Sequence, residues 1–495
     1  MRHDELNRLK DVIYPGGKRI DYSYDEVGNL HTIATTFGLV SYDYDAYNRL
    51  SRITLPNLSV IDYHYDENNY KANLTSIHYP NGTYTTFDYD NRNRMTGLTN
   101  NRPGGIISQY AYTLDGVGNR TNVSFQEPLS WVPSLVGVDY TYLPGNFLTA
   151  AGATNYSYDP NGNLYTRTQS GNTTTYTFDS QDRLTNISSP SLNIQYQYDG
   201  LFNRASRTDS GATTKYLVDP NGFLPQVIAE MDGAYNITSY YVYDGLGLVA
   251  KMTPSGSTYF YHYNGSGNTI AMTDSSGNMV NKYAYDEFGN LMNAVEAIPN
   301  AFLYVGQYGV MDDDNGLLYM RARYYDPQVG RFINKDPIRY WGGLNLFTYA
   351  QNNPINWLDP MGLRIEWNDY ILNNLLVVRN LIRLNQEIIN SGIQDNQFTL
   401  SVTGGDRFRD KCGKIRSVTT YEIVDDSSET SPHLIERGAR AVDLSVSGIS
   451  NEVFDNALGK TEFLPANTQR GYRDRHTHIG LPNSPNYHYP NYGKP

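Results

Sequence analysis

The sequence predicts a mainly β protein in which a long series of β-hairpins precedes a smaller α+β domain. Tyr is its most unusual residue, with 45 among 495 residues, and Tyr together with Gly and Asn is typical of turn-rich β structure. A motif of two aromatic residues and an Asp recurs along the first 300 residues. The composition then changes near residue 363, because residues 364–495 contain only six Tyr but four of the nine His. We therefore expect two bodies of different chemistry.

The recurring motif predicts the individual hairpins. It reads YSYDEVGNL from Tyr22, YDYDAYNRL from Tyr42, YSYDPNGNL from Tyr156 and YAYDEFGNL from Tyr283. Aromatic residues at positions i and i+2 lie on one face of a strand, the Asp opens a turn, and a following Gly or Asn accepts a positive φ. The repeated Asp occupies positions 25, 45, 66, 90, 115, 159, 179, 199, 219, 244 and 286. A period of about 20 to 25 residues is typical of repeat units that stack to share a core.

The composition also argues against several classes of protein. The formal net charge of −12 disfavours broad, sequence-independent binding of nucleic acid, which requires a basic face. The single cysteine, Cys412, excludes an intrachain disulfide and a multi-cysteine metal site. The first residues, MRHDELNRLKDV, lack an apolar core, and no run of about 18 apolar residues is present. We therefore expect neither a signal peptide nor a membrane span.

The repeats resemble the YD repeats of Rhs and teneurin-type proteins over residues 1–363. The resemblance is sharpest at RARYYDPQVGRFINKDPI, which begins at Arg321, and at the DPMGL motif from Asp359 to Leu363. It implies a spiralling β-sheet shell over residues 1–300, a core-associated segment over 301–363 and an enclosed toxin domain over 364–495. The segment HDELNRL from His3 looks like the end of a preceding repeat, so we expect a C-terminal portion of a longer shell or a shortened gene product.

The junction after DPMGL is the first candidate site. In relatives of this kind the shell cuts itself after this Leu with the help of aspartates, so the resemblance implies cleavage of the Leu363–Arg364 bond by Asp336 and Asp359. Such acid–base chemistry requires one carboxyl group to be kept protonated, by burial or by its neighbour. From the residues alone, both Asp-Pro pairs would simply form turns.

The C-terminal region carries the second candidate site. A helix that begins at Asn368 or Asp369 and ends at Gly392, followed by strand-like segments, predicts an α+β domain. The chemistry lies in SPHLIERGARAVDL, which contains His433 and Asp443, and in GYRDRHTHIGL further on. Two His and one carboxylate suit a catalytic zinc site, which takes three protein ligands and leaves one position for water.

These segments resemble the zinc D-alanyl-D-alanine carboxypeptidase family, which includes L-alanyl-D-glutamate endopeptidases and shares its fold with hedgehog domains. The resemblance implies Zn²⁺ held by His433, Asp443 and His478, a tetrahedral intermediate stabilised by His476, Asp474 as the general base, and Arg407 (or Arg409) on a substrate carboxylate. Two departures stand out. His433 and Asp443 are ten residues apart where the family has seven, which makes Glu436 a rival acid, and Arg475 occupies the family's position for the base.

The expected function is that of an Rhs-type toxin whose shell releases a zinc peptidase. Its expected substrate is the stem peptide of peptidoglycan, and its expected partners are a cognate immunity protein and a secretion machinery, without nucleic acid. A bacterial secretion system would deliver it, and it would act in the periplasm or cell wall of the target cell. Two alternatives stay open. One is a shell with a metal-dependent nuclease tip, against which the net charge of −1 in residues 364–495 argues. The other is a non-enzymatic adhesion or carbohydrate-binding protein.

Overall fold

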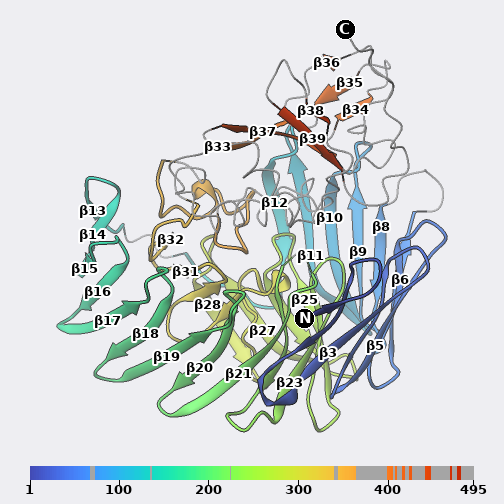
Figure 1. Cartoon of the computed structure of the whole chain (residues 1–495), viewed down its shortest axis with the longest axis horizontal. Coiled ribbons are helices and arrows are strands. Elements are labelled where there is room, and N and C mark those ends of the chain that lie inside the picture. Colours follow the sequence, from blue (N-terminus) through green and yellow to red (C-terminus); the bar gives the residue numbers. More distant parts are fainter. Residues whose placement is uncertain are drawn as a thin grey trace. The chain divides into compact units, whose positions relative to one another are not determined.

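The computed structural model describes residues 1–66, 73–133, 137–222, 224–338 and 344–363, and the backbone of seven strands between residues 399 and 480 (Figure 1). By its internal contacts the chain divides into Met1–Asn368 and Asp369–Pro495. The described part is mainly β, as predicted. Its helical turns are the short 3₁₀ segments η1 (Pro15–Gly17), η2 (Gly306–Tyr308) and η4 (Ala350–Asn352).

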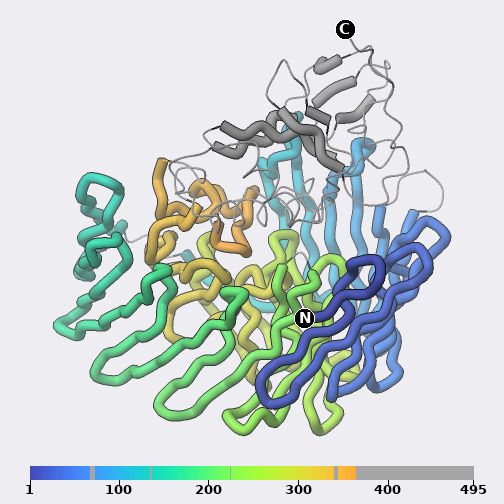
Figure 2. The backbone as a smooth tube through the Cα atoms, viewed as in Figure 1, coloured from blue at the N-terminus to red at the C-terminus, as the bar shows by residue number. Residues whose placement is uncertain are grey.

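Two large antiparallel sheets make up most of the first unit, and in each sheet every strand pairs with the next one along the chain (Figure 2). The first sheet contains β1 (Arg2–His3), β2 (Leu9–Ile13), β3 (Arg19–Tyr24), β4 (Leu30–Thr35), β5 (Gly38–Tyr44), β6 (Leu50–Thr54), β7 (Val60–Tyr65), β8 (Leu74–His78), β9 (Tyr84–Tyr89), β10 (Met95–Arg102), β11 (Gly105–Leu114) and β12 (Arg120–Gln126). The second sheet contains β13 (Tyr140–Leu143), β14 (Phe147–Ala151), β15 (Thr154–Tyr158), β16 (Leu164–Gln169), β17 (Asn172–Phe178), β18 (Leu184–Ser189), β19 (Leu192–Tyr198), β20 (Arg204–Asp209), β21 (Ala212–Asp219), β22 (Gln226–Met231), β23 (Ile237–Tyr243), β24 (Leu248–Met252), β25 (Thr258–Tyr263), β26 (Thr269–Thr273), β27 (Met279–Tyr285) and β28 (Leu291–Glu296).

Three small sheets complete the described strands. The first unit adds β29 (Met311–Asp312), β30 (Leu318–Met320), β31 (Arg323–Asp326) and β32 (Arg331–Phe332). In the second unit, β33 (Thr399–Gly404), β37 (Ala441–Ser447), β39 (His476–Gly480) and β38 (Gln469–Arg470) form one sheet in that order, and β34 (Arg407–Arg409), β35 (Ile415–Ser417) and β36 (Ile423–Asp425) form another. The helix expected from Asn368 or Asp369 to Gly392 lies outside the described residues.

The repeated Asp closes each hairpin turn by the chemistry that the motif predicts. In the turn after β5, Oδ1 of Asp45 accepts hydrogen bonds from the backbone N–H groups of Tyr47 at 2.8 Å and Arg49 at 3.0 Å. Oδ2 of the same carboxylate accepts from Nε of Arg49 at 2.7 Å. Asn48 takes the positive φ, at 60°. In most repeats the residue four positions after the Asp is an Arg or Asn, because its side chain completes the turn.

In eight motifs the second Tyr ties its repeat to the preceding one. Its hydroxyl donates to a backbone carbonyl 14 to 16 residues earlier. Such bonds join Tyr24 to Leu9, Tyr44 to Leu30, Tyr65 to Leu50, Tyr89 to Leu74, Tyr198 to Leu184, Tyr243 to Val227, Tyr263 to Leu248 and Tyr285 to Thr269. A shift in strand register directly precedes most of these tyrosines, as between Asp43 and Tyr44. Such bulges bend and twist a sheet.

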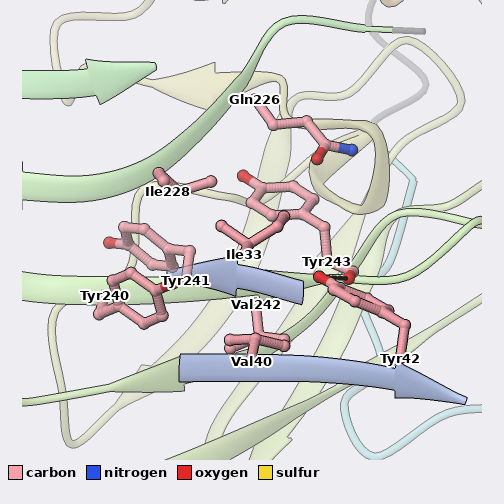
Figure 3. A pocket seen from close by; sticks show the side chains of 9 residues that line it. All are labelled: Ile33, Val40, Tyr42, Gln226, Ile228, Tyr240, Tyr241, Val242 and Tyr243. Carbon is pink, nitrogen blue, oxygen red and sulfur yellow. Dashed lines mark hydrogen bonds between the residues drawn. The ribbon is translucent and has the colours of Figure 1, made fainter. Parts of the chain in front are cut away.

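The first Tyr of several motifs instead joins the two large sheets. Tyr22 donates to Oδ1 of Asp219 at 2.6 Å, and Tyr63 donates to Oδ2 of Asp244 at 2.7 Å. Around Tyr42, whose hydroxyl donates to the carbonyl of Tyr243 at 3.0 Å, side chains of β4 and β5 face those of β22 and β23 (Figure 3). The space left there is about 10 Å³, room for one water molecule at most. This interface is packed core and has no space for a ligand.

Residues 301–363 pack against strands from both large sheets. Tyr325 donates to the carbonyl of Phe288 at 2.8 Å, between β27 and β28. The side chain of Asn356 accepts from the backbone N–H of Arg120, at the start of β12, at 2.7 Å. Arg204 of β20 is fully buried and forms an ion pair with Asp313. The shell therefore fixes this segment, and with it the DPMGL junction.

Candidate functional site

The structure brings the two aspartates of the junction together at one buried arginine. Asp336 follows β32, and Asp359 opens the DPMGL turn. Nη2 of Arg323, at the start of β31, lies 2.9 Å from Oδ2 of Asp336 and 3.3 Å from Oδ2 of Asp359. Arg323 and Asp359 are each 1% exposed and Asp336 is 2% exposed. One cation thus bridges two carboxyl groups in a site that is shielded from water.

The carboxyl group of Asp359 also reaches the residue at the predicted cleavage point. Its Oδ1 accepts the backbone N–H of Leu363 at 3.0 Å, and its backbone carbonyl accepts that of Gly362 at 3.2 Å. Nε of Arg323 donates to the carbonyl of Gly362. Oδ1 of Asp336 accepts the backbone N–H of Ile338 at 3.0 Å. The cluster therefore contacts the backbone immediately before the Leu363–Arg364 bond, whose second residue lies outside the described residues.

A second arginine clamps the same turn from outside the cluster. Arg321 donates to three backbone carbonyls, those of Pro225 at 3.0 Å, Pro360 at 2.7 Å and Tyr308 at 2.7 Å. Burial lowers the pKa of Arg321 to about 10, although the nearby Tyr319 and Tyr243 act to raise it. The turn also needs Gly362, since its φ is +64° and a Cβ there would lie 2.5 Å from the carbonyl oxygen of Met320. These contacts hold DPMGL in one conformation.

The two aspartates that the sequence pairs lie together in the structure, but sequence reasoning gave the arginines no role. Arg321 and Arg323 are two residues apart in RARYYDP, beside a strand that pairs closely with its neighbours. Two cations so close to a buried hairpin indicate that the folded chain supplies buried partners for them, because burying an unpaired charge is costly. The sequence does not show which residues those partners are, however. For Arg323 they are Asp336 and Asp359, which lie 13 and 36 residues further along the chain.

The residues predicted in the C-terminal region are only partly placed. Asp443 on β37 and His478 on β39 are directly paired in register, and His476 is paired with Ser445. Arg407 and Arg409 belong to β34, in the other small sheet. The remaining predicted residues, His433, Glu436 and Asp474, lie outside the described residues. Backbone register thus brings two of the three predicted zinc ligands together.

No group of three or more metal-binding side chains occurs within the part of the chain that the structure describes. Among the same residues, no helix is long and apolar enough to cross a membrane.

Comparison with known families agrees with the described fold. The sequence profile of the teneurin YD-shell matches residues 108–355, which is just over half of the chain. The chain belongs to the teneurin YD-shell family. The profile of the Rhs repeat matches two further stretches, residues 24–60 and 73–107. The YD-shell profile therefore covers the second large sheet and most of the segment after it, and the Rhs repeat profile covers hairpins of the first sheet.

Several bacterial toxins are similar to this YD-shell chain. The tRNA3(Ser)-specific nuclease WapA of Bacillus spizizenii is 33% identical over 271 residues, 52% of this chain and 11% of the nuclease. The double-stranded DNA deaminase toxin A of Burkholderia cenocepacia is 31% identical over 274 residues, 45% of this chain and 18% of the toxin. The matches therefore span a small part of these relatives' own length. A crystal structure of TcdB2-TccC3-TEV has the same fold, with a TM-score of 0.53 and 17% identity over 73% of this chain and 23% of that chain.

These comparisons contradict two expectations drawn from the sequence. The zinc peptidase expected in residues 364–495 is wrong, because the named relatives are nucleases and a deaminase. The peptidoglycan substrate, and with it the expected absence of a nucleic-acid partner, is wrong for the same reason. The physical cause is that His and Asp in this pattern suit many metal-dependent hydrolases, so ligand type does not select the substrate.

Proposed function

We propose that the shell cuts its own chain at Leu363–Arg364 and so frees the C-terminal unit, which acts on nucleic acid as a bacterial toxin. The observation that carries the first part is the buried Arg323–Asp336–Asp359 cluster, which is bonded to the backbone just before Leu363. The toxin relatives support the second part.

The proposed cleavage divides acid and base roles between the two aspartates. One carboxylate takes a proton from a water molecule as the water oxygen bonds to the carbonyl carbon of Leu363. The other carboxyl group, in its protonated form, donates a proton to the nitrogen of Arg364 as the C–N bond breaks. The products are a carboxyl group on Leu363 and an amino group on Arg364. Arg323 keeps both acids in place and compensates the negative charge between them.

A mass measurement of the purified full chain tests this step. We expect wild-type protein to yield a new N-terminus at Arg364 and the Asp359→Asn chain to remain whole. Asp45→Asn, which changes a turn carboxyl far from the junction in sequence, should be cut like the wild type. An uncut wild-type chain would refute the proposal, and so would normal cleavage of Asp359→Asn.

The C-terminal sequence offers features that suit a nucleic-acid substrate. Arg470, Arg473 and Arg475 precede His476 within seven residues, and such a basic stretch suits phosphate contacts despite the near-zero charge of the domain. The register pairing of Asp443 with His478 supplies a carboxylate and an imidazole, ligand types that bind divalent metals in nucleases. We propose a metal-dependent nuclease, with a cognate immunity protein and a secretion machinery as partners.

Incubation of the full chain with tRNA and with double-stranded DNA, with and without a chelator, tests the activity. We expect degradation of nucleic acid that stops in the chelator and in Asp443→Asn but persists in Ser445→Ala, a substitution on the same strand. DNA that is deaminated but not cut would show that the C-terminal unit is a deaminase and not a nuclease. If both nucleic acids stay unchanged after cleavage of the chain, the proposal fails.

A further inference from the structure

A cavity of about 140 Å³ lies in the first unit, apart from the junction cluster. Its walls come from the β13–β14 hairpin, from the turn that leads into β32 and from residues 345–352. The lining side chains combine amides, a hydroxyl and aromatic rings around one arginine. They are Tyr142, Asn146, Arg331, Asn345, Phe347, Thr348 and Asn352. The volume suits a molecule of several heavy atoms, whereas the inter-sheet space near Tyr42 holds one water at most.

Arg331 is the unusual member of this lining. It is only 7% exposed, and its Nε is buried without a hydrogen-bond partner. Nη2 donates to the carbonyl of Asn146, and the guanidinium carbon lies 4.8 Å from the ring centre of Phe347 and 5.5 Å from that of Tyr142. No ion pair joins Arg331 to a carboxylate of the described residues. Arg331 therefore lies at a cavity wall without a carboxylate at ion-pair distance.

Two other buried arginines of the described part have carboxylate partners, although Nε of Arg204 also lacks a hydrogen bond. Arg204 forms an ion pair with Asp313, and Arg323 forms ion pairs with Asp336 and Asp359. The cross-strand partner of Arg331 is Asp326, whose pKa is raised by burial although Arg331 acts to lower it, but no ion pair joins the two side chains directly. Because the cost of burying a charge without a partner is high, an unpaired arginine at a cavity indicates that a ligand supplies the missing anion.

We propose that this cavity binds a carboxylate-bearing small molecule, with Arg331 pairing to the carboxylate. A planar guanidinium suits a carboxylate because both can form two parallel hydrogen bonds. Asn146 and Asn352 are exposed at the cavity and offer amide groups to the rest of the ligand, and the half-exposed Tyr142 offers a ring face. The same chemistry is found in an organic acid and in an acidic sugar, and the choice of probes separates the two.

The test measures binding of acetate, glucuronate and glucose to the full chain by saturation-transfer NMR and by the shift in Tm, at constant ionic strength. We expect glucuronate or acetate to bind and glucose not to bind. Tighter binding of glucuronate than of acetate identifies an acidic sugar, and the reverse identifies an organic acid. Binding of glucose as tight as that of glucuronate overturns the proposal, and so does failure of both acids to bind.

Two variants locate the binding. Arg331→Gln should weaken carboxylate binding about tenfold or more, since a charged hydrogen bond is lost. If that variant does not fold, Asn352→Asp serves instead, because it places a negative charge at the cavity while keeping the side-chain shape. Asn48→Asp is the matched control, with an exposed side chain and nearly the same φ of 60° against 59°. Unchanged affinity in Asn352→Asp, or equal weakening in Asn48→Asp, contradicts the assignment.

Discussion

At Asp326 a single buried carboxyl group makes the stability of the shell depend on pH. Burial raises the pKa of Asp326 to about 6, against the opposing effects of Arg167 and of the hydrogen bond from Gln328. Its pKa in the unfolded chain is near 4, so the ionised form is disfavoured in the folded state. The contribution of Asp326 to folding stability is therefore most favourable below pH 4 and is lost as the pH rises through 6.

We predict that Asp326→Asn makes the chain more stable at pH 7.5, by up to about 2 kcal/mol, because Asn removes the buried charge and keeps an oxygen to accept from Gln328. Denaturant unfolding at pH 7.5 and at pH 4 checks this. The gain should vanish at pH 4, where the wild-type carboxyl is already neutral in the folded state. A variant that is less stable than the wild type at pH 7.5 contradicts the prediction.

Arg323 provides a second prediction at the same scale. Arg323→Lys keeps the positive charge, but one ammonium group cannot also reach the carbonyls of Gly362 and Leu346, to which Arg323 now donates. We therefore expect self-cleavage to slow by about tenfold or more, measured as the fraction of cut chain over time. Arg52→Lys, at an exposed ion pair with Asp62, is the control and should cleave normally. An unchanged rate of self-cleavage in Arg323→Lys would show that Arg323 is not part of the cleavage site.

The sequence predicts less of this site than of the fold, and the reason is physical. Asp336 and Asp359 stand in recognisable Asp-Pro motifs, so both could be named. The bridge through Arg323, the unpaired Arg331 and the raised pKa of Asp326 all depend on burial, which arises only when distant segments pack. No local pattern in the sequence carries that information.

Among the elements, the hairpins of the repeat use two tyrosines that look alike in the motif but differ in the folded chain. Both lie on one face of the strand, as the spacing of two predicts. In β7, Tyr63 bonds to the buried carboxyl of Asp244 in the second sheet, whereas Tyr65 bonds to the carbonyl of Leu50 in its own sheet. The pattern predicts the shared face, but the partner of each hydroxyl depends on how the sheets pack.

We predict that Tyr63→Phe destabilises the chain more than Tyr65→Phe. The first change removes the donor to Oδ2 of the Asp244 carboxyl, whose Oδ1 keeps the backbone N–H groups of Leu246 and Gly247, at a cost of about 1–3 kcal/mol. The second change removes an ordinary neutral bond worth about 1 kcal/mol. Chemical denaturation of the two single variants measures the difference. Equal losses in the free energy of unfolding, or a larger loss for Tyr65→Phe, would show that the cross-sheet hydrogen bond contributes no more to stability than the bond within the sheet.

The turns of these hairpins predict acid sensitivity. Although burial acts to raise it, hydrogen bonds from Arg49 lower the pKa of Asp45, and Arg94 and Arg183 do the same for Asp90 and Asp179. Stability from these carboxylates is present above their unfolded pKa and is lost as the pH falls through their lower folded values. In a scan from pH 7 to pH 3, we expect the Tm of the Asp326→Asn chain to decrease once the pH is below about 4. A Tm that stays level throughout would contradict this.

At the scale of the whole molecule, the two units differ in how far their sequences can be interpreted. The first unit repeats one motif, so each copy confirms the others and the hairpin fold follows. The second unit has a single copy of each segment. Its His and Asp residues predicted a metal site, and a family resemblance then suggested a peptidase that the toxin relatives contradict. A repeated pattern averages out chance matches, whereas a single short motif does not.

The bonds from Tyr22 and Tyr63 to Asp219 and Asp244 have a consequence for how such chains evolve. Tyr22 meets the turn at Asp219, whereas Tyr42 and Tyr63 both meet the end of β23, at Tyr243 and Asp244. Duplication or loss of one repeat between these tyrosines would shift every later one onto the wrong turn. A change in repeat number within this stretch would therefore break these cross-sheet hydrogen bonds unless the second sheet changed with it.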